Sequence, residues 1–462
     1  MHLTNSADLS AQQPASAALR ATWAEAWAFP GLLAKIVRNL IESWPASVYS
    51  EGLTEARFLG RRTVYVCDPV LIRQLLVDEA DGLEREDFMM RALSPALGQG
   101  VLTSDGARWR AQRRTVAPMF RHDRIACFVP AMESAVAATR LRWLAGDGRI
   151  DVLDEMMRTT FEIIGATMMP DEPGLDVEAF GRDLTAYLDR VSWKIALAML
   201  GAPRFTPHPG CLRAARAARS LRAAVAGTIA NRRRSGRDGD DLLGLMLAAR
   251  DPEGSAAMSD ESLVDNLLTF VAAGHETTAL AMAWTFRLLA EHPAVEARVL
   301  DEIAAAGPGA APEALPYARQ VVMEAMRLYP PAPLIVRRTL RPIRLGAVTI
   351  PAGRSIHVPV YAVHRHRALW TSPETFDPDR FAAANPARDK YSYLPFGAGP
   401  RVCVGMSFAL TECVTILAGL LPAFRFEAGP EPRPEARFKV TLRPHGGLAL
   451  RVVPRRGADP AW

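Results

Sequence analysis

One cysteine, Cys403, lies inside a glycine-containing stretch that reads FGAGPRVCVG, residues 396 to 405. A cysteine reacts and binds metals as the thiolate, and the N–H groups of a turn together with a nearby cation favour that anion. The glycines let the backbone approach a flat partner closely, and Arg401 could hold a negative group on that partner. An ordinary buried cysteine would explain neither the glycines nor the arginine.

Two other kinds of thiol site compete with this interpretation. A zinc site is disfavoured because no second cysteine or histidine lies at ligand spacing, and Cys413 falls within the helix expected next. A nucleophilic cysteine that works with a histidine remains open, since the chain has nine histidines.

A second unusual group, Gly274, His275, Glu276 and Thr277, lies within the stretch LLTFVAAGHETTALAMAW. This stretch is apolar on nearly every helical face, which is typical of a helix buried on all sides. A glycine inside a helix costs about 1 kcal/mol relative to alanine, and an unpaired buried carboxylate costs more. Such costs gathered in a core predict a functional site. The alternative is that Gly274 only allows close helix packing and that Glu276 reaches a hidden arginine.

The helix that carries this group is predicted to begin at Ser259, a suitable N-cap that acidic residues follow. It is predicted to end at His292, because Pro293 comes next. At a rise of about 1.5 Å per residue it would extend roughly 50 Å. A helix of that length would cross the whole molecule.

Glu324 and Arg327 lie three residues apart and therefore on one face of another predicted helix. A pair at this spacing is usually found at the surface, but the neighbouring residues are apolar and imply burial. A buried ion pair needs further hydrogen bonds to be tolerated. We therefore expect a third partner.

Composition limits the class of protein. The chain has 462 residues, of which 49% are hydrophobic, so it can bury a large core. Its net charge of +5 is small for its length, and no nucleic-acid partner is expected. Five scattered cysteines are too few for a disulfide framework, and they favour a reducing, cytoplasmic location.

Residues 1–44 are predicted to be a tail followed by an amphipathic surface helix, without a secretory signal. Charged residues and a proline interrupt the apolar stretch WAFPGLLAKIVRNLIESW, so no transmembrane segment is expected. Residues 45–462 are predicted to form a single domain, because no flexible linker or internal repeat divides them.

The predicted fold is mainly α-helical with small β-sheets. Short strands are expected within residues 57–69 and 339–361, where β-branched residues alternate with glycine and proline. Helical periodicity covers most of the remaining chain, with clear helices at 69–79, 106–120, 238–251, 317–329 and 406–424.

The pattern Phe396-x-x-Gly399-x-Arg401-x-Cys403-x-Gly405 resembles the heme-binding loop of the cytochrome P-450 monooxygenases. The motif AGHETT at residues 273–278 resembles the oxygen-binding groove in the long central helix of that family.

Further segments carry the same resemblance. Glu324-x-x-Arg327 resembles the ion-pair helix of the family, and Arg380 lies in a segment similar to the one that supplies the third member. The motifs occur in the family's order, and the resemblance covers roughly residues 45 to 455. It is weakest between about 165 and 235, the segment that covers the substrate cavity in this family.

The resemblance implies a heme b between the central helix and the cysteine loop, with Cys403 as the iron ligand. It implies that Trp109, Arg113 and Arg337 contact the heme propionates. The other residues implied at the heme are those of the cysteine loop, namely Phe396, Gly397, Arg401 and Gly405.

On the other face of the heme, the resemblance implies that Gly274 leaves room for O2 and that Thr277 can hydrogen-bond it. Glu276 would pass protons inward from solvent. The implied reaction is the reductive cleavage of O2, with one atom inserted into a C–H or double bond of the substrate and the other released as water. Glu324, Arg327 and Arg380 would be structural.

The electrons are expected from a separate ferredoxin or flavodoxin and its reductase, because the chain has no room for a fused electron-transfer domain. Arg108, Arg110, Arg113 and Arg114 crowd a helix that the resemblance places near the cysteine side of the heme. Such a cluster could steer an acidic donor. Some of these arginines could instead form a solvated face.

The substrate is expected to be a hydrophobic small molecule, because the segments expected to line the cavity are mostly apolar. These are residues 86–102 and 332–336, the turn at Pro444 and His445, and the helix positions Leu267, Phe270 and Val271. The alternative for apolar residues at helical spacing is that they belong to the core.

Two other functions remain open. A heme-thiolate peroxygenase or isomerase would need no electron donor, but such proteins usually lack an acid and alcohol pair like Glu276 and Thr277. A non-catalytic heme gas sensor would usually carry an output domain, and none is visible in the sequence.

Overall fold

A computed structural model describes residues 35, 38–58, 61–169, 177–199, 202–203, 205–236, 239, 241–250, 258–385 and 388–455. The chain forms two compact units. The first comprises Met1–Glu86, Pro333–Pro373 and Arg388–Val402, and the second comprises Asp87–Ala332, Glu374–Ala387 and Cys403–Trp462. The predicted tail and surface helix at residues 1–44 lie almost entirely outside the described residues.

The first unit is built on a five-stranded sheet with the order β1-β2-β8-β5-β3. Strands β2 and β8 run parallel, with Val64 opposite Ile356, whereas the other neighbours are antiparallel. The strands are β1 Leu53–Phe58, β2 Arg61–Val66, β3 Leu83–Glu84, β5 Ile335–Thr339 and β8 Ser355–Val358, and a separate hairpin pairs β6 Ile343–Leu345 with β7 Val348–Ile350.

Short helices complete the first unit. The residues predicted as one helix at 69–79 form α2 Pro69–Arg73, which Asp68 caps, and a π-helical turn, η4 Gln74–Asp78. The other helices are η2 Leu40–Ser43, η3 Ala46–Tyr49, η5 Ala80–Gly82, α13 Val360–Val363, η9 Lys390–Ser392 and η10 Gly399–Arg401.

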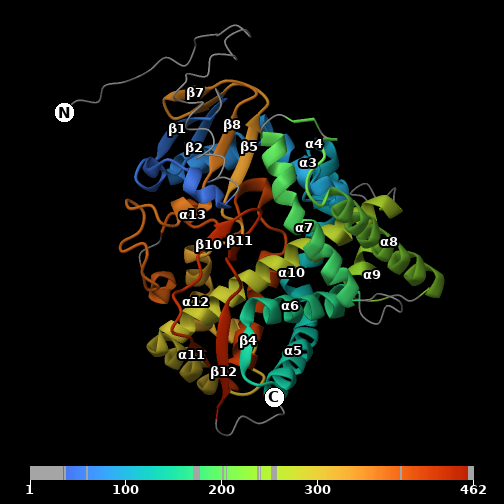
Figure 1. The fold of residues 1–462 in the computed structure, drawn as a ribbon, viewed down its shortest axis with the longest axis vertical. Helices are drawn as coiled ribbons and strands as arrows, with labels where there is room; N and C mark the ends of the chain where they lie inside the picture. The colour runs from blue at the N-terminus through green and yellow to red at the C-terminus, as the bar shows by residue number, and fades with distance from the viewer. Residues whose placement is uncertain are drawn as a thin grey trace. The chain divides into compact units, whose positions relative to one another are not determined.

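The second unit is mainly helical (Figure 1). Its α-helices are α3 Asp87–Leu97, α4 Gly106–Val116, α5 His122–Ala145, α6 Val152–Met168, α7 Val177–Met199, α8 Cys211–Ser235, α9 Leu242–Ala248, α10 Asp260–Glu291, α11 Pro293–Ala306, α12 Pro316–Leu328 and α14 Met406–Leu420. Three short 3-10 helices, η6 Ala117–Phe120, η7 Pro312–Ala314 and η8 Pro378–Phe381, connect them.

Two small sheets belong to the second unit. One has the order β4-β12-β9, with β4 Arg149–Asp151, β9 Phe424–Ala428 and β12 Ala449–Pro454, and the other is the hairpin of β10 Ala436–Phe438 and β11 Leu442–Pro444. All pairs in these sheets are antiparallel, and Arg437 lies opposite Arg443 in the hairpin. A mainly α-helical fold with small sheets is therefore confirmed.

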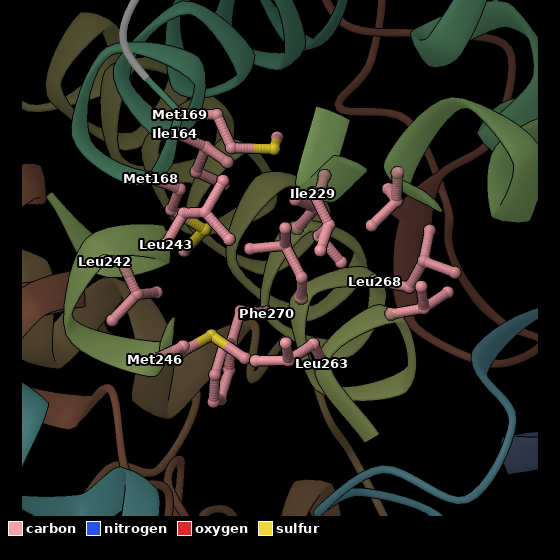
Figure 2. Packing of buried hydrophobic residues seen from close by; sticks show 14 of the residues in the cluster. Ile164, Met168, Met169, Ile229, Leu242, Leu243, Met246, Leu263, Leu268 and Phe270 are labelled. Atoms are coloured by element: carbon pink, nitrogen blue, oxygen red, sulfur yellow. The ribbon is translucent and has the colours of Figure 1, made fainter. Parts of the chain in front are cut away.

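Helix α10 forms the core of the second unit, where α6, α8, α12 and α14 pack against it. The side chain of Ser259 accepts a hydrogen bond from Ser262 N at its first turn, and His292 follows its last residue, as predicted. A cluster of apolar side chains from α6, α8, α9 and α10 fills the space beside this helix (Figure 2). Burial of such apolar surface is the main stabilising term, and it fixes α10 in one position.

Candidate functional site

Cys403 is an exposed residue whose thiol group is nevertheless surrounded by protein. The residue is exposed, yet burial raises the pKa of its thiol. The N–H of Gly405 and the guanidinium of Arg113 oppose this rise, as expected for groups that stabilise a thiolate, but burial outweighs them. Both properties fit a thiol that faces a bound group, and the raised pKa indicates that a bound cation would be needed to hold the thiolate form.

Phe120, at the end of η6, connects the cysteine loop to α10. Its ring packs edge-on against Phe270 of α10, with ring centroids 5.2 Å apart. Its Cε1 atom would lie 3.9 Å from a Cβ atom built on Gly405, which is ordinary contact distance. The sequence offered no signal for Phe120, because an aromatic residue after a helix is most often part of the core.

One strip of α10 is accessible within an otherwise buried helix. From Leu263 to Leu289 every residue is buried except Ala272, Ala273, Gly274 and Thr277. Residues three and four apart share one face of a helix. Ala273, Gly274 and Thr277 therefore form one open surface. The hydroxyl of Thr277 donates to the carbonyl oxygen of Ala273 over 2.5 Å.

The accessible strip differs from the predicted lining of the substrate cavity. Leu267, Phe270 and Val271 are buried in the apolar core cluster. These three residues therefore belong to the core, as the alternative interpretation expected.

Gly274 also packs closely against a neighbouring helix. A Cβ atom at this position would lie 3.0 Å from Cδ1 of Ile164 in α6, which is closer than most real contacts. The hydroxyl of Thr160 in α6 donates to the carbonyl oxygen of His275 over 3.0 Å. Close packing against Ile164 is thus one reason for a glycine at this position.

Glu276 forms an ion pair with an arginine, which was the alternative to a functional role in the sequence analysis. Its Oε1 atom accepts a hydrogen bond from Nε of Arg443 at 2.7 Å and another from the hydroxyl of Thr441. Arg443 lies in β11 and Thr441 directly precedes that strand. Neither contact could be predicted, because some 165 residues separate the partners in the chain and no local pattern marks them.

Trp109 and Arg113 lie on α4, both partly buried. Burial lowers the pKa of Arg113, and Cys403 opposes this change, so the guanidinium and the thiol are close enough to interact. Trp109 packs against the apolar core cluster. The structure therefore brings Arg113 close to Cys403.

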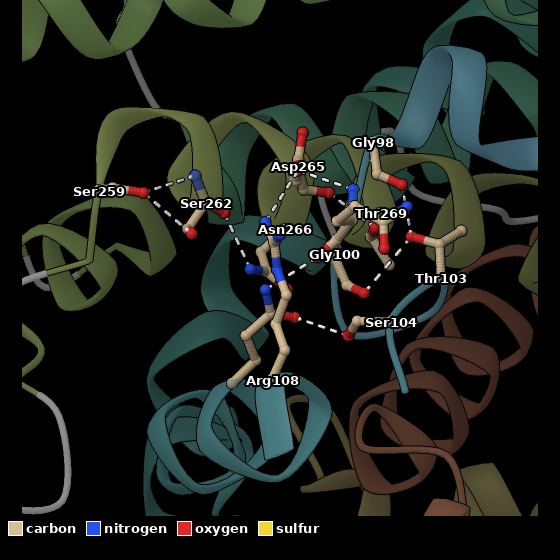
Figure 3. Close-up of polar contacts among 12 residues, drawn as sticks. Gly98, Gly100, Thr103, Ser104, Arg108, Ser259, Ser262, Asp265, Asn266 and Thr269 are labelled. Atoms are coloured by element: carbon tan, nitrogen blue, oxygen red, sulfur yellow. Dashed lines mark hydrogen bonds and ion pairs between the residues drawn. The ribbon is translucent and has the colours of Figure 1, made fainter. Parts of the chain in front are cut away.

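The chain before α4 is fixed to α10 by a polar cluster (Figure 3). Asp265 is fully buried and accepts a hydrogen bond from Gln99 N at 2.7 Å and from Arg222 of α8 at 2.7 Å. Asn266 accepts from Val101 N at 2.8 Å. A Cβ atom at Gly100 would lie 2.6 Å from the carbonyl oxygen of Asp265, so only glycine allows this close approach. The cluster thereby sets where α4 begins.

The remaining predicted heme contacts belong to the first unit. Arg337 lies in β5, where its Nη1 donates to the carbonyl oxygen of Val336. Phe396 and Gly397 precede η10, and Arg401 ends it. Gly397 has a left-handed φ of 73°, which glycine adopts without strain.

Gly399 has a different role from the one predicted. Its φ is 72°, and a Cβ atom there would lie 2.0 Å from the carbonyl oxygen of Leu76. The close approach at this glycine is therefore to the backbone of η4 and not to a flat partner.

The ion pair of α12 has the third partner that was expected. Glu324 and Arg327 are fully buried and joined by two hydrogen bonds of 2.7 and 2.8 Å. Nε of Arg380 lies 3.3 Å from Oε1 of Glu324. The carbonyl oxygen of Thr375 and the N–H of Asp377 complete the network, which joins α12 to the segment before η8.

Glu412 in α14 is a buried carboxyl group that the sequence analysis did not single out. In the part of the chain that the structure describes, neither of its oxygens has a hydrogen-bond partner of ordinary geometry. Burial raises its pKa to about 8, and the nearby hydroxyl of Thr278 in α10 opposes this only partly. A charged residue in the apolar stretch MSFALTECVTIL was a signal that could have found it.

Cys403 offers a single protein ligand to a metal. Across the described ranges, no group of three or more histidine, cysteine, aspartate or glutamate side chains is arranged to hold a metal ion. A metal held through Cys403 would therefore take its other ligands from a prosthetic group, for which the accessible thiol and Arg113 provide suitable partners. None of the helices described is both long and apolar enough to cross a membrane.

Comparison with known proteins gives consistent results. The family model described as Cytochrome P450 matches residues 51–450. The chain is 34% identical over 395 residues to a cyclooctat-9-en-7-ol 5-monooxygenase of Streptomyces melanosporofaciens, covering 83% of this chain and 85% of the relative. It is 32% identical over 409 residues to a pentalenene oxygenase of Streptomyces avermitilis, covering 86% and 89%.

A solved structure has the same fold. It is described as the crystal structure of the cytochrome P450DA heme domain and aligns with a TM-score of 0.78 at 28% sequence identity. The alignment covers 88% of this chain and 90% of that one.

Proposed function

Because this chain belongs to the cytochrome P450 family and is a heme-thiolate monooxygenase, we propose that Cys403 is the thiolate ligand of its heme iron. The observation that carries this proposal is that Cys403 is exposed in a glycine-containing loop and that its thiol interacts with the guanidinium of Arg113. When bound, the heme supplies the activation of O2, and a thiolate ligand favours cleavage of the O–O bond.

The heme is proposed to be heme b, held without a covalent bond, since the sequence has no C-x-x-C-H attachment motif. Arg113, which already interacts with Cys403, would neutralise a propionate together with Trp109, Arg337 and Arg401. Phe396, Gly397 and Gly405 would shape the loop that carries the ligand.

The accessible strip of α10 is proposed to be the side on which O2 binds. Gly274 and Thr277 belong to this strip, and a hydroxyl group there can donate to a ligand if it leaves the carbonyl oxygen of Ala273. Glu276, which directly precedes Thr277 in the helix, would take protons from solvent and pass them to this side. The ion pair of Glu276 with Arg443 supports this role, because it places the carboxylate beside a partly exposed group.

Electrons are proposed to come from a separate acidic ferredoxin or flavodoxin with its reductase. Arg108, Arg110 and Arg114 are exposed on α4, the helix that also carries Arg113. A cluster of positive charge raises the association rate of an acidic partner. The free state of all five cysteines supports a reducing, cytoplasmic location.

The substrate is proposed to be a hydrophobic, cyclic small molecule. The accessible residues of α10 include two alanines and a glycine, which offer an apolar surface. The printed names of two relatives refer to cyclic skeletons, cyclooctat-9-en-7-ol and pentalenene.

The test is to supply the heme-loaded protein with 18O-labelled O2, a ferredoxin and reductase system, and a panel of cyclic alkenes. The proposal predicts a product that carries one labelled oxygen and forms only when electrons are supplied. Product formed from hydrogen peroxide alone, with none formed from O2 and electrons, would indicate a peroxygenase and contradict the proposal.

A further inference from the structure

The carboxylate of Asp265 in α10 holds several segments of the second unit at one buried point (Figure 3). Its side chain is not exposed, and Oδ2 accepts a hydrogen bond from the N–H of Gln99 over 2.7 Å. Oδ1 accepts from Nη1 of Arg222 in α8, also over 2.7 Å, and the same nitrogen donates to the carbonyl oxygen of Ala96 in α3. Nη2 of Arg108 in α4 lies 3.9 Å from Oδ2. Because a buried charge is stable only with such partners, these contacts tie α3, α4 and α8 to α10.

Gln99 connects Asp265 to α4. While its N–H donates to the carboxylate, its carbonyl oxygen accepts a hydrogen bond from Nε2 of Gln112 in α4 at 2.8 Å. Oε1 of Gln112 accepts in turn from the hydroxyl of Ser104 at 3.1 Å, and both of these side chains are buried. A buried polar group that loses its partner is costly. Helix α4 therefore cannot shift against α10 without breaking hydrogen bonds that water does not replace.

Two glycines let the loop that contains Gln99 lie directly against α10. Gly98 has a left-handed φ of 59°, and a Cβ atom there would clash with Oδ1 of Asp265. A Cβ atom at Gly100 would lie 2.6 Å from the carbonyl oxygen of Asp265. This second clash involves the backbone, which cannot rotate away as a flexible side chain can. A side chain at Gly100 would therefore push the loop off α10 without changing any charge.

Helix α4 carries Arg113, one of the residues proposed to contact the heme. Gln112 directly precedes it, and the guanidinium of Arg113 interacts with the thiol of Cys403. Since a helix is one hydrogen-bonded unit whose neighbouring residues move together, the bond that fixes Gln112 also fixes Arg113. Asp265 itself lies twelve residues before Thr277 in α10, about 18 Å along the helix. An effect of Asp265 on the heme therefore has to pass through α4.

We infer that Asp265 is a positioning residue for the site proposed to hold the heme, because its hydrogen bond with Gln99 fixes α4 and with it Arg113. Arg222 of α8 keeps the carboxylate in place. The inference rests on the proposed function, in which Cys403 binds the heme iron and Arg113 neutralises a propionate. A cation at this position stabilises the thiolate and the reduced heme, so a shift of α4 should change both the reduction potential and the retention of the heme. The inference also gives α8, in the segment where the family resemblance is weakest, an indirect part in holding the heme.

Gly100→Ala tests the inference without removing a charge. The added methyl group should move the loop and α4 off α10 and so take Arg113 away from the thiolate. We expect the one-electron equilibrium of the heme to shift about threefold or more toward the oxidised form, and the heme to dissociate about fivefold faster. A redox titration and heme transfer to an acceptor apoprotein measure these two quantities. Gly227→Ala is the matched control and should change neither, because Gly227 is exposed in α8 and nothing lies within 4 Å of an added Cβ atom.

The arginine of α8 is tested against a second ion pair of the same helix. Arg222→Gln removes the cation that holds Asp265, and it should shift the reduction equilibrium in the same direction as Gly100→Ala, by a smaller factor. Arg232 forms a similarly short pair with Asp241, at 2.8 Å, and the two side chains are 3% and 9% exposed. Arg232→Gln should lower the free energy of unfolding and leave the reduction equilibrium unchanged. A role of Arg222 in stability alone would give the same result for both arginines.

A double-mutant cycle identifies the route of the effect. If Asp265 acts through Arg113, adding Gly100→Ala to Arg113→Gln should cause little further shift of the reduction equilibrium. Gln112→Met removes the hydrogen bond between α4 and Gln99 while Asp265 keeps its partners. It takes the place of Gly100→Ala in the cycle if that variant does not retain heme.

The outcomes separate the two proposals. If Arg113→Gln changes neither the reduction equilibrium nor heme retention, the proposed contact of Arg113 with the heme fails, and the inference fails with it. If Arg113→Gln changes them while Gly100→Ala does not, the inference about Asp265 is overturned alone. An equal shift from Gly100→Ala with and without Arg113 would also overturn it. A shift from Gly100→Ala without one from Arg222→Gln would overturn the part assigned to Arg222.

Discussion

The carboxylate of Glu324 and the guanidinium of Arg327 are joined by two hydrogen bonds at 2.7 and 2.8 Å, and neither side chain is exposed. The pair lies within one helix, yet its further contacts reach the segment before η8. It therefore joins parts of the second unit that are some fifty residues apart in the chain.

Glu324→Ala should leave Arg327 buried without its partner, which typically costs about 3 to 5 kcal/mol. We expect little folded, heme-loaded protein, measured as heme per polypeptide and as the free energy of unfolding in denaturant. The control is Asp379→Asn, since Arg298 and Asp379 form a similar two-point pair that is about half exposed. That change should cost no more than about 1 kcal/mol. Equal stability of Glu324→Ala and the parent protein would refute the structural role.

Glu412 should make stability depend on pH. Its pKa is about 8 in the folded protein and 4.5 without burial, so between these values the folded state holds a proton that the unfolded state has lost. The free energy of unfolding should therefore fall as pH rises from about 5 to 8. Glu412→Gln should reduce this slope. Its free energy of unfolding, relative to that of the parent protein, should therefore be higher at pH 8 than at pH 5, which unfolding measurements at both pH values will show. A slope that Glu412→Gln leaves unchanged would assign the pH dependence to other groups.

The local features of the site could be predicted, and the long-range ones could not. Ser259, the length of α10 and the Glu324–Arg327 spacing are encoded within a few residues, so capping and helical periodicity are enough to find them. Arg443 and Thr441 reach Glu276 only after the chain has folded. Gly399 could be noticed in the sequence. The close approach to the backbone of Leu76 that requires a glycine there could not be predicted, because Leu76 is far away in the chain.

Thr277→Ala should separate the use of electrons from product formation. The hydroxyl group lies on the accessible strip of α10, and within the described residues its hydrogen bond stays in its own helix turn, so its loss should leave folding and heme content intact. Without a donor at this position, reduced oxygen should escape as hydrogen peroxide, and product per electron pair should fall severalfold. Peroxide and product are titrated in parallel, and Thr277→Ser is the control that keeps the hydroxyl. Unchanged coupling in Thr277→Ala would exclude this role.

Arg114, an exposed arginine of α4, should matter for the electron donor. Arg114→Glu reverses an exposed charge and should raise the KM for an acidic ferredoxin several-fold, with an effect that shrinks at high salt because the charges are screened. Arg319→Glu, at an exposed position on α12, is the matched control. Donor titrations at two salt concentrations measure the difference. If both variants raise the KM equally, α4 is not the docking site.

The central claim is that Cys403 binds the heme iron as a thiolate, and the carbon monoxide difference spectrum of the reduced protein tests it most directly. The parent protein should show the absorption band of a thiolate-ligated heme. Cys403→Ser should lose that band, whereas Cys413→Ser, which changes a buried thiol ten residues away in α14, should keep it. A thiolate band that persists in Cys403→Ser would contradict the assignment.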